Sequence, residues 1–128
     1  MALRMTALEG RYAVCRLAPE AEVPSWPRGA FVSITRTPDE LSIVCDESAV
    51  PDDVRAERDW RLLRVEGPIP FETTGVAAAI TQPLAEARIS VFLVATFDTD
   101  YLLVKSEAFD QALGALSASG LLVRNDCL

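Results

Sequence analysis

Histidine is absent from the 128 residues of this chain. Histidine is the commonest general base and the commonest zinc ligand, so its absence removes the Ser-His and Cys-His nucleophile pairs and most zinc sites. The chemistry still open to the chain uses carboxylates, lysines, hydroxyls and backbone amides. We therefore expect a protein that is not an enzyme and that holds neither a metal ion nor a cofactor.

Long apolar runs and clusters of basic residues are absent as well. The longest apolar stretches, such as residues 89–95, are far shorter than the roughly 20 residues that span a bilayer. Twelve basic and 19 acidic residues give a formal net charge of −7, and the arginines are scattered, so nucleic acid phosphates would be repelled. Residues 1–10 lack the pattern of a secretion signal. We expect a cytoplasmic protein that binds neither nucleic acid nor a membrane.

Cysteines are few and unpaired in the sequence. Cys15, Cys45 and Cys127 stand at wide, unrelated spacings with no CxxC motif. Cys15 and Cys45 lie within apolar, strand-like runs, which favours reduced thiols in a core. Half of the residues are apolar and 24% are charged, which is the composition of a globular chain with room for one domain or two small half-domains.

From Trp60 onward the apolar pattern switches repeatedly between strand and helix. Apolar residues recur every three or four positions across one stretch and in short continuous runs on either side of it. The predicted order is strand, helix, strand, strand, helix, strand, which is the βαββαβ pattern of the ferredoxin-like α+β fold. The predicted segments are 60–66, 75–87, 90–97, 101–105, 106–120 and 121–124, with Ser106 as the cap of the second helix. The strand at 90–97 is expected to be buried on both faces.

The first half of the chain supplies fewer regular elements. Residues 1–10 are predicted to lead into a strand at Tyr12–Leu17, and residues 18–29 contain three prolines and are expected to form a loop. A hairpin is predicted between 30–37 and 41–45, followed by a short helix or turn that begins near Pro51. We therefore expect a degraded half-domain over residues 1–59 and a complete βαββαβ unit over residues 60–128.

Two polar corners of the complete unit are predicted to lie together. In a βαββαβ unit, the loop into the first helix and the turn between the second and third strands are at the same end of the sheet. Thr73-Thr74-Gly75 should therefore neighbour Asp98-Thr99-Asp100. Backbone amides at a helix start suit a carboxylate, and aspartates suit an ammonium or guanidinium group. Together they would suit a zwitterion such as a free amino acid.

Other interpretations of the same corners remain open. Thr73 or Thr74 is predicted to cap the helix at 75–87 through its hydroxyl, which is common capping, and Asp-Thr-Asp is common in turns. A Mg²⁺ or Ca²⁺ site would need six or more oxygen ligands, which no loop here supplies. An enzyme would have to use Asp98, Asp100, Glu72 or Lys105, with no marked nucleophile beside them.

The stretch GVAAAITQPLAEARISVFLVATFDTDYLLV, with the preceding Glu72-Thr73-Thr74, resembles the second ACT domain of small bacterial proteins built from two ACT-like halves. It is similar to the CASTOR arginine sensors and to the regulatory domains of aspartate kinases. The resemblance implies a non-catalytic domain that binds a small molecule, usually an amino acid, between ACT units. It also implies ligand contacts from the helix-opening loop and the end of the next strand, at Glu72, Gly75, Val76, Thr96, Phe97, Asp98 and Asp100.

We therefore expect an amino-acid-binding regulatory module that forms a homodimer and acts on a protein partner. In this hypothesis, the amides of Gly75 and Val76 hold the ligand carboxylate, and Asp98 or Asp100 holds its cationic group. The alternative is a structural or protein-interaction domain without a small-molecule ligand. The candidate ligand-binding residues are Glu72, Thr73, Thr74, Gly75, Val76, Thr96, Phe97, Asp98 and Asp100.

Overall fold

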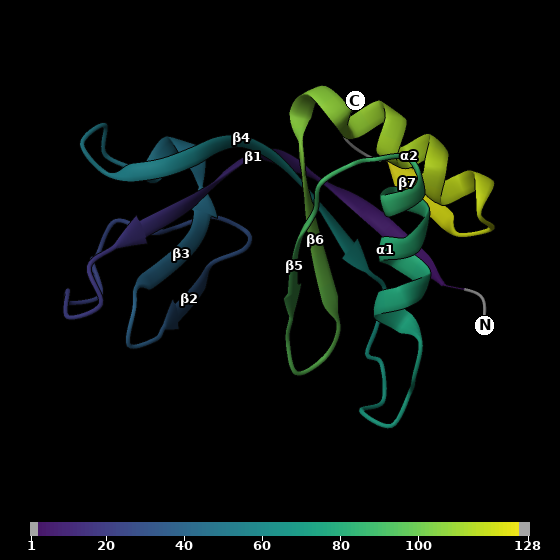
Figure 1. Ribbon diagram of the computed structural model, residues 1–128, viewed down its shortest axis with the longest axis horizontal. Helices are drawn as coiled ribbons and strands as arrows, with labels where there is room; N and C mark the ends of the chain where they lie inside the picture. Colours follow the sequence, from purple (N-terminus) through teal and green to yellow (C-terminus); the bar gives the residue numbers. More distant parts are fainter. Residues whose placement is uncertain (1–2, 126–128) are drawn as a thin grey trace. The chain divides into compact units, whose positions relative to one another are not determined.

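The structure is a computed structural model that describes residues 3–125 (Figure 1). The chain divides into two compact units. The larger unit combines the chain up to Glu9 with the chain from Arg61 onward, and the smaller unit is Gly10–Trp60. Two long strands, β1 (Arg4–Leu17) and β4 (Arg55–Val65), each contribute residues to both units. The predicted division into residues 1–59 and 60–128, with a degraded first half, stays a prediction.

The smaller unit is a sheet in the order β2-β3-β1-β4. β2 (Ser33–Arg36) pairs antiparallel with β3 (Leu41–Asp46), and β3 pairs antiparallel with β1 from Tyr12 to Leu17. The predicted hairpin is therefore confirmed. The short helix or turn predicted near Pro51 is a turn, in which the Val54 amide donates a 3.2 Å hydrogen bond to the Pro51 carbonyl. β4 then begins at Arg55, and a 3₁₀ segment, Glu47–Ala49, precedes the turn. Asp46 starts that 3₁₀ segment by accepting a 2.9 Å hydrogen bond from the Ser48 amide.

The thiols of Cys15 and Cys45 are buried and free, which confirms the prediction of reduced core residues. Burial, and then the neighbouring Cys45, raise the pKa of Cys15 to about 11. Burial also raises the pKa of Cys45. Both side chains therefore stay uncharged at neutral pH and pack as small apolar groups. Cys127 lies outside the described residues.

The larger unit confirms the predicted βαββαβ order and the ferredoxin-like α+β fold. β4 is followed by α1 (Val76–Glu86), β5 (Phe92–Ala95), β6 (Asp100–Lys105), a 3₁₀ turn (Ser106–Ala108), α2 (Phe109–Ala118) and β7 (Leu122–Asn125). Both helices cover the same face of the sheet and lie side by side (Figure 1). Their apolar sides pack on alternate residues of three strands, and the central members of this core are Met5, Leu63, Val65, Ile80, Leu84, Leu102 and Leu116.

The start of β1 enters the larger sheet between β4 and β7. β7 pairs with β1 in parallel, with Arg4 opposite Leu122 and Ala7 opposite Asn125. The sheet order in this unit is therefore β5-β6-β4-β1-β7. The prediction that residues 1–10 only lead into a strand is wrong for Arg4 to Gly10, which belong to β1.

Three local predictions in the larger unit are also wrong. β5 is half exposed rather than buried on both faces, because it is the last strand of the sheet; Leu93 is 38% exposed. Gly75, not Thr73 or Thr74, is the N-cap of α1, and no side chain caps that helix. Ser106 begins a 3₁₀ turn, and α2 starts after Ala108. Within the described residues, no helix is long and apolar enough to cross a membrane.

Candidate functional site

The two polar corners predicted from the sequence meet in the larger unit. A cavity of about 240 Å³, which we call the turn cavity, lies between the segment before α1 and the β5–β6 turn. One water molecule needs at least about 10–15 Å³ of such a cavity, so the turn cavity has room for several waters. That is enough for a small metabolite. Six predicted residues line it: Thr73, Val76, Thr96, Phe97, Asp98 and Asp100.

The β5–β6 turn is fixed by its two threonines. The hydroxyl of Thr96 donates to the Thr99 carbonyl at 2.7 Å, and the Thr99 amide donates back to that hydroxyl at 3.3 Å. The hydroxyl of Thr99, a buried residue, donates to the Val65 carbonyl on β4 at 2.6 Å. These hydrogen bonds attach the turn to the neighbouring strand, so the backbone positions of Asp98 and Asp100 are defined.

The segment after β4 is attached to the same turn. The Ile69 amide donates a 2.7 Å hydrogen bond to the Asp98 carbonyl. A Cβ on Gly67 would lie 3.0 Å from the Thr99 Cβ and 3.1 Å from the Asp98 carbonyl oxygen. Glycine at position 67 therefore permits a close approach that a larger residue would prevent without movement of the backbone. The two walls of the turn cavity are held together at this point.

The start of α1 forms the second wall. Gly75 takes a left-handed conformation with φ of 82°, and the carbonyl of Gly75 accepts the first helical hydrogen bond, from Ala79. Val76, the first residue of the helix, lines the turn cavity. No side chain caps α1, so its first-turn amides, at the positive end of the helix dipole, have no side-chain partner.

Two phenylalanines stand at the cavity on opposite walls. Phe71 comes from the segment before α1 and Phe97 from the β5–β6 turn, and their rings meet edge to face with 4.7 Å between centroids. Phe71 is 72% exposed and Phe97 is 78% exposed. So much exposed aromatic surface at one place is a common mark of a binding site.

The charged groups of the turn cavity are carboxylates. Asp98 and Asp100 line it, and among the residues of the described chain that line it there is no lysine or arginine. Within residues 3–125, no group of three His, Cys, Asp or Glu side chains could hold a metal ion. The chemistry of the walls is therefore a carboxylate pair, an aromatic pair and the amide end of a helix.

The elements that frame this cavity are also those that a known family shares. The sequence model of the ACT domain matches residues 55–118, from the start of β4 to the end of α2. The chain belongs to the ACT domain family. A second family model, for an N-terminal domain, matches residues 10–53.

Known relatives of this ACT protein confirm the resemblance to arginine sensors and to regulatory domains of aspartate kinases. The cytosolic arginine sensor for mTORC1 subunit 1 of Bos taurus is 28% identical over 106 residues, which are 74% of this chain and 32% of the relative. The chain thus spans about a third of the length of that sensor.

Two solved structures fix the fold of the ACT protein. A protein from Agobacterium tumefaciens is 36% identical to this chain, with a TM-score of 0.94. The alignment covers 100% of this chain and 96% of the other. The regulatory subunit of aspartate kinase from Thermus thermophilus is 13% identical, with a TM-score of 0.58 over 86% of this chain and 93% of that one. The second likeness shows the fold alone.

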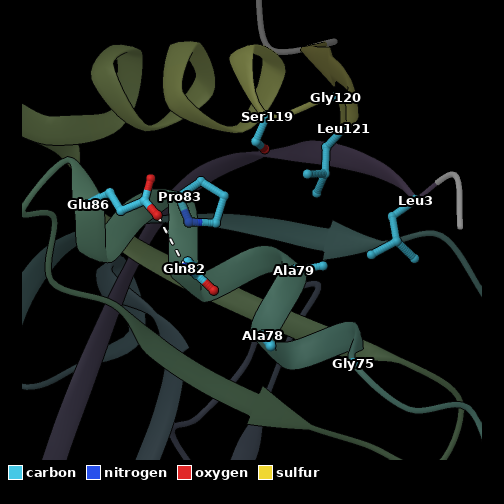
Figure 2. A pocket seen from close by; sticks show the side chains of 10 residues that line it. All are labelled: Leu3, Gly75, Ala78, Ala79, Gln82, Pro83, Glu86, Ser119, Gly120 and Leu121. Carbon is cyan, nitrogen blue, oxygen red and sulfur yellow. Dashed lines mark hydrogen bonds between the residues drawn. The ribbon is translucent and has the colours of Figure 1, made fainter.

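Three predicted site residues of the ACT unit lie outside the turn cavity, namely Glu72, Thr74 and Gly75. Gly75 lines a different cavity of about 420 Å³, formed by α1, the end of α2 and Leu3. Figure 2 shows it between Ala78, Ala79 and Pro83 on α1 and Ser119 to Leu121 beyond α2. A contact of these three residues with a ligand stays a prediction.

Sequence reasoning missed Phe71 and Thr99 as parts of the ACT site. Phe71 lines the turn cavity and pairs with Phe97. Thr99 lines it and anchors the turn to β4. The position of Phe71, an aromatic residue in a proline-rich loop, was a signal that could have indicated a role in the site. Nothing in the local sequence distinguished the buried Thr99 from an ordinary turn threonine.

Proposed function

We propose that this ACT protein is a non-catalytic regulatory module that binds a free amino acid in the turn cavity. The observation that carries the proposal is the joining, in one cavity, of the uncapped start of α1 with the two carboxylates of the β5–β6 turn. A helix start attracts a carboxylate and an aspartate attracts a cation. An amino acid carries both groups.

Each wall has a role in this proposal. The first-turn amides at Val76, with Gly75 before them, receive the ligand carboxylate. Asp98 or Asp100 receives the cationic group, and the rings of Phe71 and Phe97 cover the ligand from the solvent side. Aromatic faces attract a cation as well as apolar stems, which suits an amino acid with a long cationic side chain.

Arginine is the first ligand to test. The Bos taurus relative is named a cytosolic arginine sensor, and a guanidinium forms paired hydrogen bonds with one carboxylate. We also propose that the chain works in the cytoplasm and that ligand binding changes its association with a regulated protein partner.

Titration calorimetry with L-arginine, and then with the other protein amino acids, tests the proposal. We expect saturable binding, and we expect Asp100→Asn to weaken it by roughly 10- to 100-fold, because a hydrogen bond to a charged group contributes about 1.5–3 kcal/mol. Asp53→Asn removes the same charge from an exposed turn of the smaller unit and should leave the affinity unchanged. Glu72→Gln tests whether Glu72, a predicted contact that does not line the turn cavity, takes part in binding.

The absence of heat with all of the protein amino acids at millimolar concentration would contradict the proposal. An affinity that falls equally in the Asp100 and Asp53 variants would also contradict it, because the effect would then come from net charge alone.

A protein-interaction domain without a ligand is the second candidate. Edge strand β5, with half-exposed Leu93 and with Phe97 just beyond its end, favours it, because an open sheet edge can pair with another chain. Capture of partners from native lysate, with and without added arginine, separates the two functions. A partner that ignores the amino acid and still binds Asp100→Ala supports the interaction domain.

A further inference from the structure

A second charged cavity lies on the face of the larger sheet that is turned away from the helices. Its volume is about 430 Å³, and its lining includes Arg64 and Glu66 from β4, Asp98 and Thr99 from the β5–β6 turn, and Tyr101 from β6. We call it the back-face cavity. All of its lining residues belong to the larger unit.

Strand alternation places this cavity opposite the helices. Leu63 and Val65 are members of the core under α1 and α2, so Arg64 and Glu66 project from the other side of β4. On β6, Leu102 is a member of the same core, so its neighbour Tyr101 also projects away from the helices. The turn cavity and the back-face cavity thus lie on two sides of the β5–β6 turn and share Asp98 and Thr99.

Two of the three charged side chains that line the back-face cavity have no partner within residues 3–125. Glu66 accepts a 3.0 Å hydrogen bond from the Thr6 hydroxyl. Half-buried Arg64 has no hydrogen bond or ion pair with any residue in the range 3–125, and the same holds for the carboxylate of Asp98. A guanidinium with five donors and a carboxylate therefore face one cavity without partners.

We propose that the back-face cavity is a second binding site for a small zwitterion of the amino acid class. The ligand carboxylate pairs side by side with the guanidinium of Arg64, and its cationic group pairs with Asp98. A simple anion would be repelled by Glu66 and Asp98, and a simple cation would be repelled by Arg64. A molecule with both charges satisfies both groups. This site does not require the turn cavity to be occupied.

Titration calorimetry on paired variants tests the second site with each protein amino acid as the probe. Of the two cavities, Asp100 lines the turn cavity but not the back-face cavity, and Arg64 lines the back-face cavity but not the turn cavity. We expect the Asp100→Asn variant to keep one binding event. In the double variant, which adds Arg64→Met, the affinity of that event should fall by at least tenfold. Arg55→Met, on the exposed start of β4, is the matched control with the same charge change and should keep that event. Thermal unfolding of each variant checks that it is folded.

The outcomes also separate the two proposals. A binding event that survives Asp100→Asn and depends on Arg64 supports the second site. Binding that disappears with Asp100→Asn overturns the second site and leaves the proposed function standing. Binding that survives both substitutions overturns the role of Arg64, and the absence of all binding overturns both proposals.

Discussion

Two glycines of the larger unit differ in what they require of the backbone. Gly75 has a φ of 82° at the N-cap of α1, whereas Gly114 lies within α2. A Cβ at either position would meet no atom within 4 Å, so crowding does not distinguish them. The backbone conformation alone decides the effect of an added methyl group.

Alanine at these two positions should therefore act in opposite directions. Gly75→Ala should lower the free energy of unfolding by about 1–2 kcal/mol, because a Cβ is disfavoured in the left-handed region. Gly114→Ala should raise it by about 0.4–1 kcal/mol, because alanine restricts the unfolded chain and favours a helix. Urea denaturation of both variants measures the difference. Changes of the same sign would show that the conformation of one glycine is not as described.

The residues of the candidate site were partly predictable from the sequence. The aspartates at 98 and 100 could be placed near the start of α1 because topology alone puts those corners at one end of the sheet. The role of Gly75 could not, because it depends on which way the backbone turns before the helix. Thr99 and Phe71 could not either, since their partners are Val65 and Phe97, and only the folded chain brings those pairs together.

At the scale of elements, local patterns predicted what local contacts determine. The helix at 75–87 and the hairpins at 30–45 and 90–105 rest on apolar spacing and turn residues close in sequence. The beginning of β1 was missed because its partner β7 lies at the other end of the chain. The exposure of β5 was missed because a four-residue apolar run looks the same at the edge of a sheet as in the middle.

Strand β1 determines how a truncated chain should behave. A fragment of residues 60–128 lacks β1, which pairs with β7 and supplies the buried side chains of Met5 and Ala7. Loss of one buried Met side chain alone removes about 1.5–3 kcal/mol from a total stability of about 5–15 kcal/mol. We expect the fragment to show no cooperative thermal transition by circular dichroism.

A peptide of residues 1–17 provides the control for that fragment. If β1 is the missing element, the peptide should restore a cooperative transition whose midpoint temperature rises with peptide concentration. A fragment that unfolds cooperatively without the peptide would show instead that residues 60–128 form an independent domain.

At the scale of the whole molecule, we expect a homodimer in solution. ACT units leave sheet edges open, and the edge strand β5 carries half-exposed Leu93. Sedimentation velocity should give twice the mass of the chain, with association stronger at higher salt because each chain has a net charge of −7. Leu93→Lys should weaken it, and Val23→Lys, at an exposed apolar residue of a loop in the smaller unit, is the control. A monomer at the highest concentration reached would contradict the prediction.

The pairing of β1 with β7 also affects the order of events during synthesis. Arg4 leaves the ribosome 118 residues ahead of its partner Leu122. At the roughly 5–20 residues per second of translation, this is an interval of about 6–24 seconds. Throughout it, one edge of β1 has no strand beside it, and such edges promote aggregation. The nascent chain is therefore the form of this protein that would gain most from a chaperone.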